Sequence, residues 1–395
     1  MSMLERLPNE LLNQMLTGLD KPDLGRVCLS CHRLRAVSEP VLYCSFEEDH
    51  GNAERVRLFL LTIIKRPDLA LHCEGLELAH WEENRRHDRP NGLLANGEQM
   101  RPRNDDLVLA QAAIRAGLLD RRLSQYTRSG DTSVDPDGKR LLKGSFGHLW
   151  YTEGPSSFLV YANLLLTMLQ RVKFAYLDWD WSDSHRILWG NRGGNDGDIV
   201  RNRGFSELRT LKFEGSSDYN CPERVHLGSC LYVPSLRTIS CNEGLDVRIY
   251  LERPFIPLRL THIQLVYCRT SVEQLEMLFN ACEALTDFHY MFRTSDYYGS
   301  KHVAYGVIAA LAKHQKSLKW LGVVVNRDYL LHRDQFLGVF PSYRSTRALP
   351  QFEALSCVQL DFCTLLNVDR KMHQMLPYEL SIAPSSFACL FSHLS

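Results

Sequence analysis

The sequence predicts a mixed α/β fold, in which a small N-terminal helical unit precedes an irregular array of strand–helix repeats. Two observations lead to this prediction. Apolar residues recur at helical spacing near the start of the chain, and a short strand-like pattern recurs along the remainder. With 45% hydrophobic residues, the 395-residue chain has ample material for a large core.

The N-terminal segment predicts short amphipathic helices. Pro8 suits the first position of a helix, and Glu10 in the first turn favours the positive end of the helix dipole. Apolar side chains then share one helical face at positions 11, 12, 15, 16 and 19. A second periodic run, expected to end before Pro40, contains Leu24, Val27, Cys28, Cys31 and Leu34.

These helices carry more aliphatic surface than a unit of their size can bury alone. Each aliphatic side chain left exposed forgoes about 1.5–3 kcal/mol of burial free energy, and an exposed stripe of several often marks a partner site. Two interpretations follow. The helices dock on the rest of the chain, or a separate protein covers them.

The order of residues in this segment resembles the F-box. The matching elements are Leu-Pro-x-Glu-Leu-Leu from Leu7, the run from Val27 to Arg35, and Pro-Val-Leu-Tyr from Pro40. The resemblance implies a three-helix unit that binds a Skp-type adaptor and, through it, a cullin scaffold. It carries adaptor contact onto Leu7, Pro8, Leu11, Leu12, Leu16, Leu24, Val27, Cys31 and Leu34. Gly18 and Gly25 depart from good helix formers, each at a cost of about 1 kcal/mol relative to alanine.

The segment Cys28-Leu29-Ser30-Cys31-His32 also matches the spacing of a c-type haem attachment site. Both cysteines fall on the apolar helical face, and no second ligand pair follows at zinc-finger spacing. We therefore interpret them as core residues rather than as haem or zinc ligands.

The remaining chain repeats the pattern Leu-x-x-aliphatic-x-apolar. The last two positions of a copy lie two residues apart, so they point to the same side of a strand. The copies are Leu169/Val172/Phe174, Leu208/Leu211/Phe213, Leu236/Ile239/Cys241, Leu260/Ile263/Leu265, Leu285/Phe288/Tyr290, Leu318/Leu321/Val323 and Leu355/Val358/Leu360, with a weaker Cys73/Leu76/Leu78 and a possible Leu380/Ile382.

Helix-like stretches separate the copies, as in residues 270–282, which begin with a capping box, and residues 302–314. One strand and one helix per unit resembles the irregular leucine-rich-repeat region that often follows an F-box. The expected domains are thus an F-box at 1–45, a connecting region with a first irregular repeat at 46–168, and a leucine-rich-repeat-like solenoid at 169–395. The alternative is an ordinary α/β domain with unrelated strands.

Residues alternating with the buried positions are expected to line one exposed face. They are Arg171, Lys173, Thr210, Lys212, Thr238, Ser240, His262, Gln264, Asp287, His289, Trp320, Gly322, Cys357 and Gln359. Of these, Lys212, His262, Gln264, Asp287, His289, Trp320 and Gln359 are the predicted target-binding residues, because a polar surface with an aromatic suits protein recognition. The alternative is the solvated side of a sheet.

Two other segments are less informative. Residues 80–156 are expected to form long loops around one helix at 105–119, and the cluster of Arg85, Arg86, His87 and Arg89 there reads as a solvated loop rather than an anion site. Acids at 178, 180 and 183 fail the EF-hand pattern. Trp179, Trp181 and Trp189 offer interface area or core.

Charge and composition bound the function. Lys+Arg and Asp+Glu are equal at 46 each, which argues against a nucleic-acid or membrane partner. No apolar run approaches the length of a membrane span, no secretory signal is evident, and we expect a cytoplasmic or nuclear protein.

No nucleotide loop or Gly-x-Ser-x-Gly elbow occurs, so we expect no catalytic residue, cofactor or metal. The leading hypothesis is a substrate-recognition subunit of an SCF-type E3 ubiquitin ligase. The alternatives are a leucine-rich-repeat interaction scaffold outside ubiquitination and, from another class, a hydrolase with a dimerisation unit.

Overall fold

The computed structural model describes residues 6–48, 53–78, 104–115, 158–178, 206–215, 223–249, 251, 256–293, 303–326, 351–361 and 379–382. The chain divides into two compact units. The first comprises Met1–Leu177 and Asp183–Leu208, and the second comprises Asp178–Ser182 and Arg209–Ser395. The boundaries predicted after residues 45 and 168 both fall inside the first unit, and the three-part division stays a prediction.

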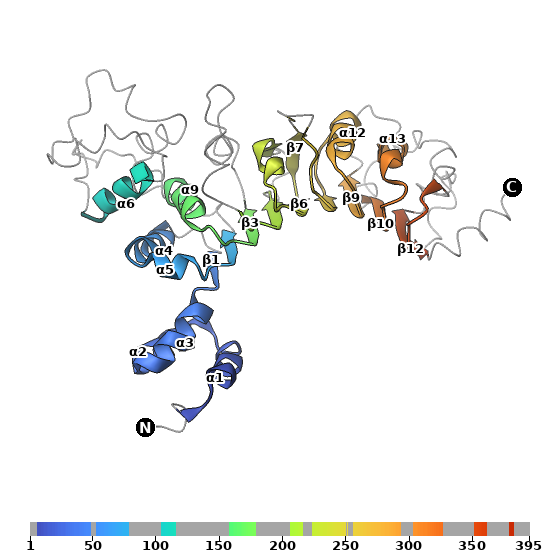
Figure 1. The fold of residues 1–395 in the computed structure, drawn as a ribbon. Coiled ribbons are helices and arrows are strands. Elements are labelled where there is room, and N and C mark those ends of the chain that lie inside the picture. The colour runs from blue at the N-terminus through green and yellow to red at the C-terminus, as the bar shows by residue number, and fades with distance from the viewer. Residues whose placement is uncertain are drawn as a thin grey trace, which may run out of the picture. The chain divides into compact units, whose positions relative to one another are not determined.

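Three helices open the first unit: α1 (Asn9–Leu16), α2 (Lys21–Ser30) and α3 (His32–Leu42) (Figure 1). Pro8 is the N-cap of α1, one position before the predicted one. The side chain of Asp20 caps α2 by accepting a hydrogen bond from the Asp23 amide at 2.8 Å.

The second periodic run is two helices rather than one. Cys31 has extended backbone angles, which end α2, and its Sγ accepts from the Leu34 amide at 3.5 Å to cap α3. Helix α3 then continues through Pro40 instead of ending before it. Apolar residues keep the same helical spacing across both helices, and Cys31 lies at one of the expected positions although its backbone is not helical. The spacing alone therefore did not reveal the break between α2 and α3.

The described remainder of the first unit contains three parallel strands and several helices. Strands β1 (Ser45–Glu48), β2 (Gly75–Leu78) and β3 (Phe174–Asp178) pair in that order. The helices are α4 (Ala53–Lys65), α5 (Pro67–Ala70), α6 (Asn104–Arg115) and α9 (Phe158–Met168), with α4 lying against both α6 and α9. Helix α6 confirms the predicted helix over residues 105–115, and the predicted remainder at 116–119 lies outside the described residues.

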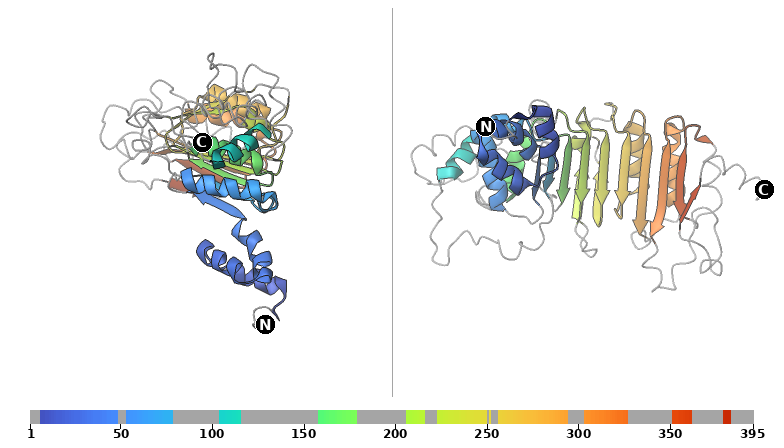
Figure 2. Two further views of the ribbon diagram at one scale, coloured as in Figure 1. Left: turned by 90° about the vertical axis from the view of Figure 1, so that its left-hand side faces the viewer. Right: turned by 90° about the horizontal axis from the view of Figure 1, so that it is seen from below.

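The second unit is built on a sheet whose strands run parallel except at one end. In spatial order these are β4 (Thr210–Glu214), β6 (Thr238–Asn242), β8 (His262–Val266), β9 (Asp287–Arg293), β10 (Trp320–Asn326), β11 (Cys357–Asp361) and the antiparallel β12 (Glu379–Ile382) (Figure 2).

Helices and a strand pair occupy one side of this sheet. They are α12 (Val272–Ala281), α13 (Val303–Ala310), the 3-10 helices η4 (Ser229–Tyr232) and η6 (Leu311–His314), and the parallel pair β5 (Glu223–Leu227) and β7 (Leu245–Ile249). Figure 1 shows α12, α13 and β7 on the same side of strands β6, β9 and β10. The predicted helices at 270–282 and 302–314 are therefore confirmed.

The repeated pattern coincides with the core of this unit. Each copy from Leu208 to Leu318 has all three of its apolar positions at 2% exposure or less, as does the weak Cys73 copy. Its strands run in register, so Ile239, Ile263, Phe288, Leu321 and Val358 form one buried row. A mixed α/β fold with a parallel sheet is thus confirmed.

The predicted positions of the copy that begins at Leu169 lie three residues too early in the sequence. Phe174 is exposed, whereas Val172, Ala175 and Leu177 are buried, and Ala175 and Leu177 pair with Leu76 and Leu78 of β2. Leu169 directly follows α9, so the apolar residue that suggested the frame belongs to the end of a helix. Arg171 and Lys173 consequently precede the strand and do not lie on its exposed face.

The last possible copy also differs from the repeat. Leu380 and Ile382 do form a strand, but β12 pairs antiparallel with β11, so that Leu360 faces Leu380. A period of two residues carries no information on strand direction.

Candidate protein-binding surfaces

The predicted adaptor-contact residues separate into buried and accessible groups. Leu12, Leu16 and Leu24 are buried in the three-helix unit. Leu7, Val27, Cys31 and Leu34 are half-buried. Pro8 and Leu11 are exposed.

An apolar stripe follows the accessible side of α1. Leu11 is 46% exposed, Met15 is 54% exposed and Leu19 is 40% exposed. Leu11 and Met15 lie one helical turn apart, and Leu19 follows just past the helix end. We call these three residues the α1 stripe. Met15 and Leu19 belonged to the predicted apolar face but not to the predicted contacts.

Leu29 of α2 is a further exposed apolar residue, which the predicted apolar face did not include, and it is the most exposed of the large hydrophobic side chains described. It lies out of phase with Leu24, Val27 and Cys28. A leucine off the periodic face was the available signal.

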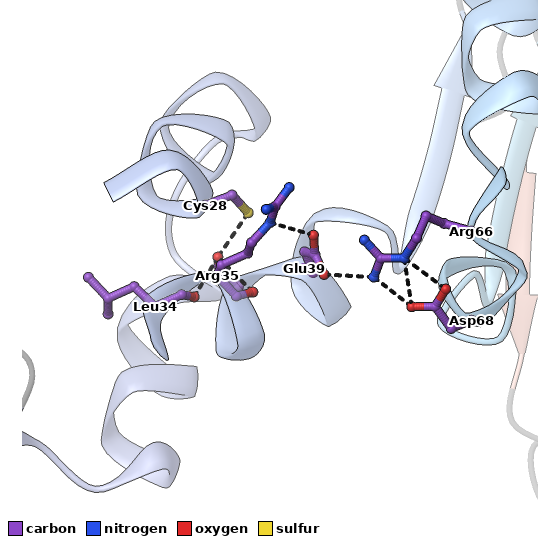
Figure 3. A network of polar contacts seen from close by, with 7 residues as sticks. Cys28, Leu34, Arg35, Glu39, Arg66 and Asp68 are labelled. Carbon is purple, nitrogen blue, oxygen red and sulfur yellow. Dashed lines mark hydrogen bonds and ion pairs between the residues drawn. The ribbon is translucent and has the colours of Figure 1, made fainter. Parts of the chain in front are cut away.

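Hydrogen bonds and ion pairs hold the three helices together and tie them to the next helices. Arg33 Nη2 donates to the Leu7 carbonyl oxygen at 2.6 Å, which fixes the start of α1 against α3. Cys28 Sγ lies 2.9 Å from Ser38 Oγ, joining α2 to α3. Figure 3 shows Cys28 at one end of a polar network running along α3.

The other end of the network crosses from α3 to the segment between α4 and α5. Glu39 accepts from Arg35 Nε at 2.9 Å and from Arg66 Nη2 at 3.1 Å, and Arg66 also pairs with Asp68 at 2.6 Å (Figure 3). Burial alone raises the pKa of Glu39, but the hydrogen bonds and charges of Arg66 and Arg35 outweigh it and lower that pKa below its usual value. The carboxylate is therefore a charged anchor at neutral pH.

The strand face of the second unit brings the predicted target-binding residues together. Register pairing places them on two neighbouring rows across the parallel strands. The first row is Thr210, Thr238, His262, Asp287, Trp320 and Cys357; the second is Lys212, Ser240, Gln264, His289, Gly322 and Gln359. Sequence alternation thus placed these residues on one face of the second unit, but Ser240 and Gly322 are buried there rather than exposed as predicted. The function of the face stays a prediction.

Polar contacts organise the middle of this face. His262 Nε2 lies 2.9 Å from Asp287 Oδ2, and Thr261 Oγ1 lies 2.7 Å from His262 Nδ1. The rings of His289 and Trp320 meet edge to face with centroids 5.0 Å apart. Lys212 pairs with Glu214 at 3.5 Å.

The Thr261–His262–Asp287 chain has the residue types of a catalytic triad, but its setting is that of a surface. The His262 side chain is about half exposed, and Thr261 Oγ1 also lies 3.3 Å from the Arg237 carbonyl. His262 and Asp287 lie on the strand face that also carries the other predicted target-binding residues.

The cysteines of the described ranges are free, and five are buried: Cys73, Cys230, Cys241, Cys268 and Cys282. Burial raises the pKa of Cys73, Cys230 and Cys282 to about 12, so these thiols stay protonated. The Cys28 thiol contacts Ser38 Oγ, and the Cys31 thiol accepts from the Leu34 amide. No group of three or more His, Cys, Asp or Glu side chains in the described ranges is placed to hold a metal ion.

Two sets of residues singled out in the sequence lie outside the described residues: the cluster at Arg85, Arg86, His87 and Arg89, and the tryptophans at 179, 181 and 189. Among the helices that are described, none combines the length and apolar character of a membrane span.

Neither family models, nor curated proteins, nor solved structures give a match to this chain.

Proposed function

We propose that this chain is a non-catalytic substrate-recognition subunit of an SCF-type E3 ubiquitin ligase. It binds a Skp-type adaptor through the N-terminal three-helix unit and a target protein through the strand face of the second unit. The observation that carries the proposal is the α1 stripe, which leaves Leu11, Met15 and Leu19 exposed on a unit whose residue order resembles the F-box.

The stripe supports adaptor binding on energetic grounds. Burying the exposed half of each of three large aliphatic side chains contributes about 1 kcal/mol per residue. The half-buried Leu7, Val27 and Leu34 extend the apolar area beyond α1. Leu12, Leu16 and Leu24 contribute indirectly, because they form the core that presents the stripe.

Features of the second unit support its assignment as a leucine-rich-repeat-like region. One parallel strand per copy and a buried apolar position at each equivalent site follow the logic of stacked repeats. The copy starting at Leu260 also has a cysteine at the Asn/Cys position of the strict repeat. That residue, Cys268, donates from Sγ to the Cys241 carbonyl oxygen at 3.1 Å, linking one copy to the copy before it.

In this function the chain has no bond-making step. A ligase partner performs the chemistry, and the receptor accelerates it by holding target lysines close to the charged ubiquitin carrier.

Co-purification with a Skp-type adaptor tests the proposal. The informative variant is Leu11→Lys with Met15→Lys, because both side chains are exposed and their replacement leaves the core intact. Leu12→Lys is unsuitable, because it would bury a charge in the three-helix core. Leu58→Lys is the matched control, since Leu58 lies on α4 of the same unit and is 55% exposed.

The wild-type chain and the Leu58→Lys control are expected to co-elute with the adaptor, and the double variant is expected not to. Absence of a wild-type complex, or equal binding by the double variant, would count against the proposal. Adding a cullin separates the ligase subunit from the scaffold, because a scaffold outside ubiquitination would bind the adaptor without recruiting the cullin.

A further inference from the structure

A tryptophan and a carboxylate stand side by side on the strand face of the second unit. Trp320 of β10 is the register partner of Asp287 of β9 in the parallel sheet. Their side chains therefore leave the same face from adjacent strands, which are about 4.8 Å apart.

The Trp320 ring is held in place. A Cβ atom at Gly322 would lie 2.9 Å from Trp320 Cη2 and 2.6 Å from His289 Cδ2, so the missing side chain at Gly322 provides the space that both rings occupy. The edge-to-face contact with His289 supports the indole from the neighbouring strand. Trp320 remains half-exposed, which makes it a pre-positioned aromatic surface.

The Asp287 carboxylate is also held in place, by two contacts to the same one of its oxygens. Thr286 Oγ1 donates to Oδ2 at 2.5 Å, and His262 Nε2 lies 2.9 Å from the same atom. On the other side of the His262 ring, Nδ1 lies 2.7 Å from Thr261 Oγ1, which fixes the orientation of the imidazole beside Asp287. Among the described residues both contacts fall on Oδ2, which leaves Oδ1 available to a ligand.

We propose that this site takes the guanidinium group of an arginine in a bound protein, stacked on Trp320 and donating to Asp287 Oδ1. The identification of the arginine as part of a ligase target rests on the proposed function. The Asp287 carboxylate beside Trp320 is the argument for a cation. Among the described residues of these two rows, the basic side chains are Lys212, which pairs with Glu214, and the imidazoles of His262 and His289. Arginine fits better than lysine, because its planar group both stacks on aromatic rings and matches a carboxylate.

Selection from a random peptide display library against the full-length chain tests the inference. Binders to the wild-type chain are expected to contain arginine. For the best peptide, replacing the arginine by the uncharged isostere citrulline should weaken binding about fivefold or more, as measured by fluorescence anisotropy. The same replacement should have little effect on binding to Asp287→Asn or Trp320→Ala, because the recognition is already lost.

Two controls make the outcome decisive. Met277→Ala, on α12, should bind as the wild type does, and unchanged thermal unfolding should show that each variant is folded. Asp287→Asn is the variant least able to disturb folding, since it keeps the shape of a half-exposed side chain. Failure to select any binder, binders without arginine, or an arginine dependence that persists in both variants would overturn the inference.

Adaptor co-elution measured on the same variants separates the two proposals. Asp287→Asn and Trp320→Ala should retain the adaptor, because they lie outside the three-helix unit. Intact adaptor binding without arginine selectivity overturns this inference alone. Arginine selectivity without adaptor binding overturns the proposed function and leaves a peptide-binding site.

Discussion

Adjacent leucines of α1 have opposite roles. Leu12 is buried and Leu11 is 46% exposed, although both belong to the same apolar run in the sequence. Periodicity identified the apolar side of the helix but did not divide it into a core edge and a surface edge. That division depends on where α3 packs, which is a tertiary property.

The first prediction concerns these two residues. Leu12→Ala should lower the free energy of unfolding of the three-helix unit by about 2–5 kcal/mol, because it leaves a cavity in a small core. Leu11→Ala should lower it by less than about 1 kcal/mol. Urea unfolding monitored by hydrogen exchange of α1–α3 amides distinguishes the two; equal losses would show that the stripe is part of the core.

His314 of η6 is a buried structural histidine. Its Nδ1 accepts from the Leu285 amide at 3.2 Å, and its Nε2 lies 2.9 Å from the Phe279 carbonyl oxygen. Burial lowers the pKa of His314 below 6.5, although the contact with Phe279 favours the charged form. The folded state therefore holds His314 neutral, with its proton on Nε2.

The second prediction follows from the sign of this shift. The unfolded state takes up a proton near pH 6.5 and the folded state only at lower pH, so the stability due to His314 is complete above about pH 6.5 and falls as the pH drops below it. The free-energy difference between the wild type and His314→Gln should shrink from about pH 7.5 to about pH 5.5. A difference independent of pH in this range would contradict the neutral buried assignment.

At the scale of elements, the sequence predicted most helices and strands of the described regions. Repeated apolar positions located strands β4, β6, β8, β9, β10 and β11, because each strand buries one side on the same core. The frame slipped at Leu169, where helix α9 runs into β3 and supplies an apolar residue at matching spacing. The break at Cys31 was hidden for the same reason.

The two candidate surfaces were predictable to different degrees. Strand alternation fixed the exposed rows of the second unit, because side chains of parallel strands in register align automatically. The contacts within those rows, such as His289 with Trp320, depend on Gly322 and required the three-dimensional arrangement.

The third prediction concerns the start of α12. Ser271 caps this helix by accepting from the Gln274 amide at 3.3 Å, and a hydrogen bond from Ser271 lowers the pKa of Glu273. Ser271→Ala should destabilise the first turn by about 1 kcal/mol, whereas Ser271→Asp should preserve the cap. Hydrogen exchange of the first-turn amides of α12 reports the change; equal protection in both variants would show that the cap does not contribute.

At the scale of the whole molecule, the proposed function gives each unit one binding task. In that proposal the three-helix unit offers aliphatic surface to an adaptor, and the second unit offers polar and aromatic groups to a target. This division suits a chain with no net charge, because neither task depends on a long-range electrostatic field.

The most direct test of the central claim is oxidative footprinting of methionines with and without a Skp-type adaptor. Met15 of the α1 stripe is 54% exposed and Met277 of α12 is 44% exposed, so both should react in the free chain. We predict that the adaptor protects Met15 strongly and leaves Met277 as reactive as before. Equal oxidation of Met15 in the presence and absence of saturating adaptor would contradict it.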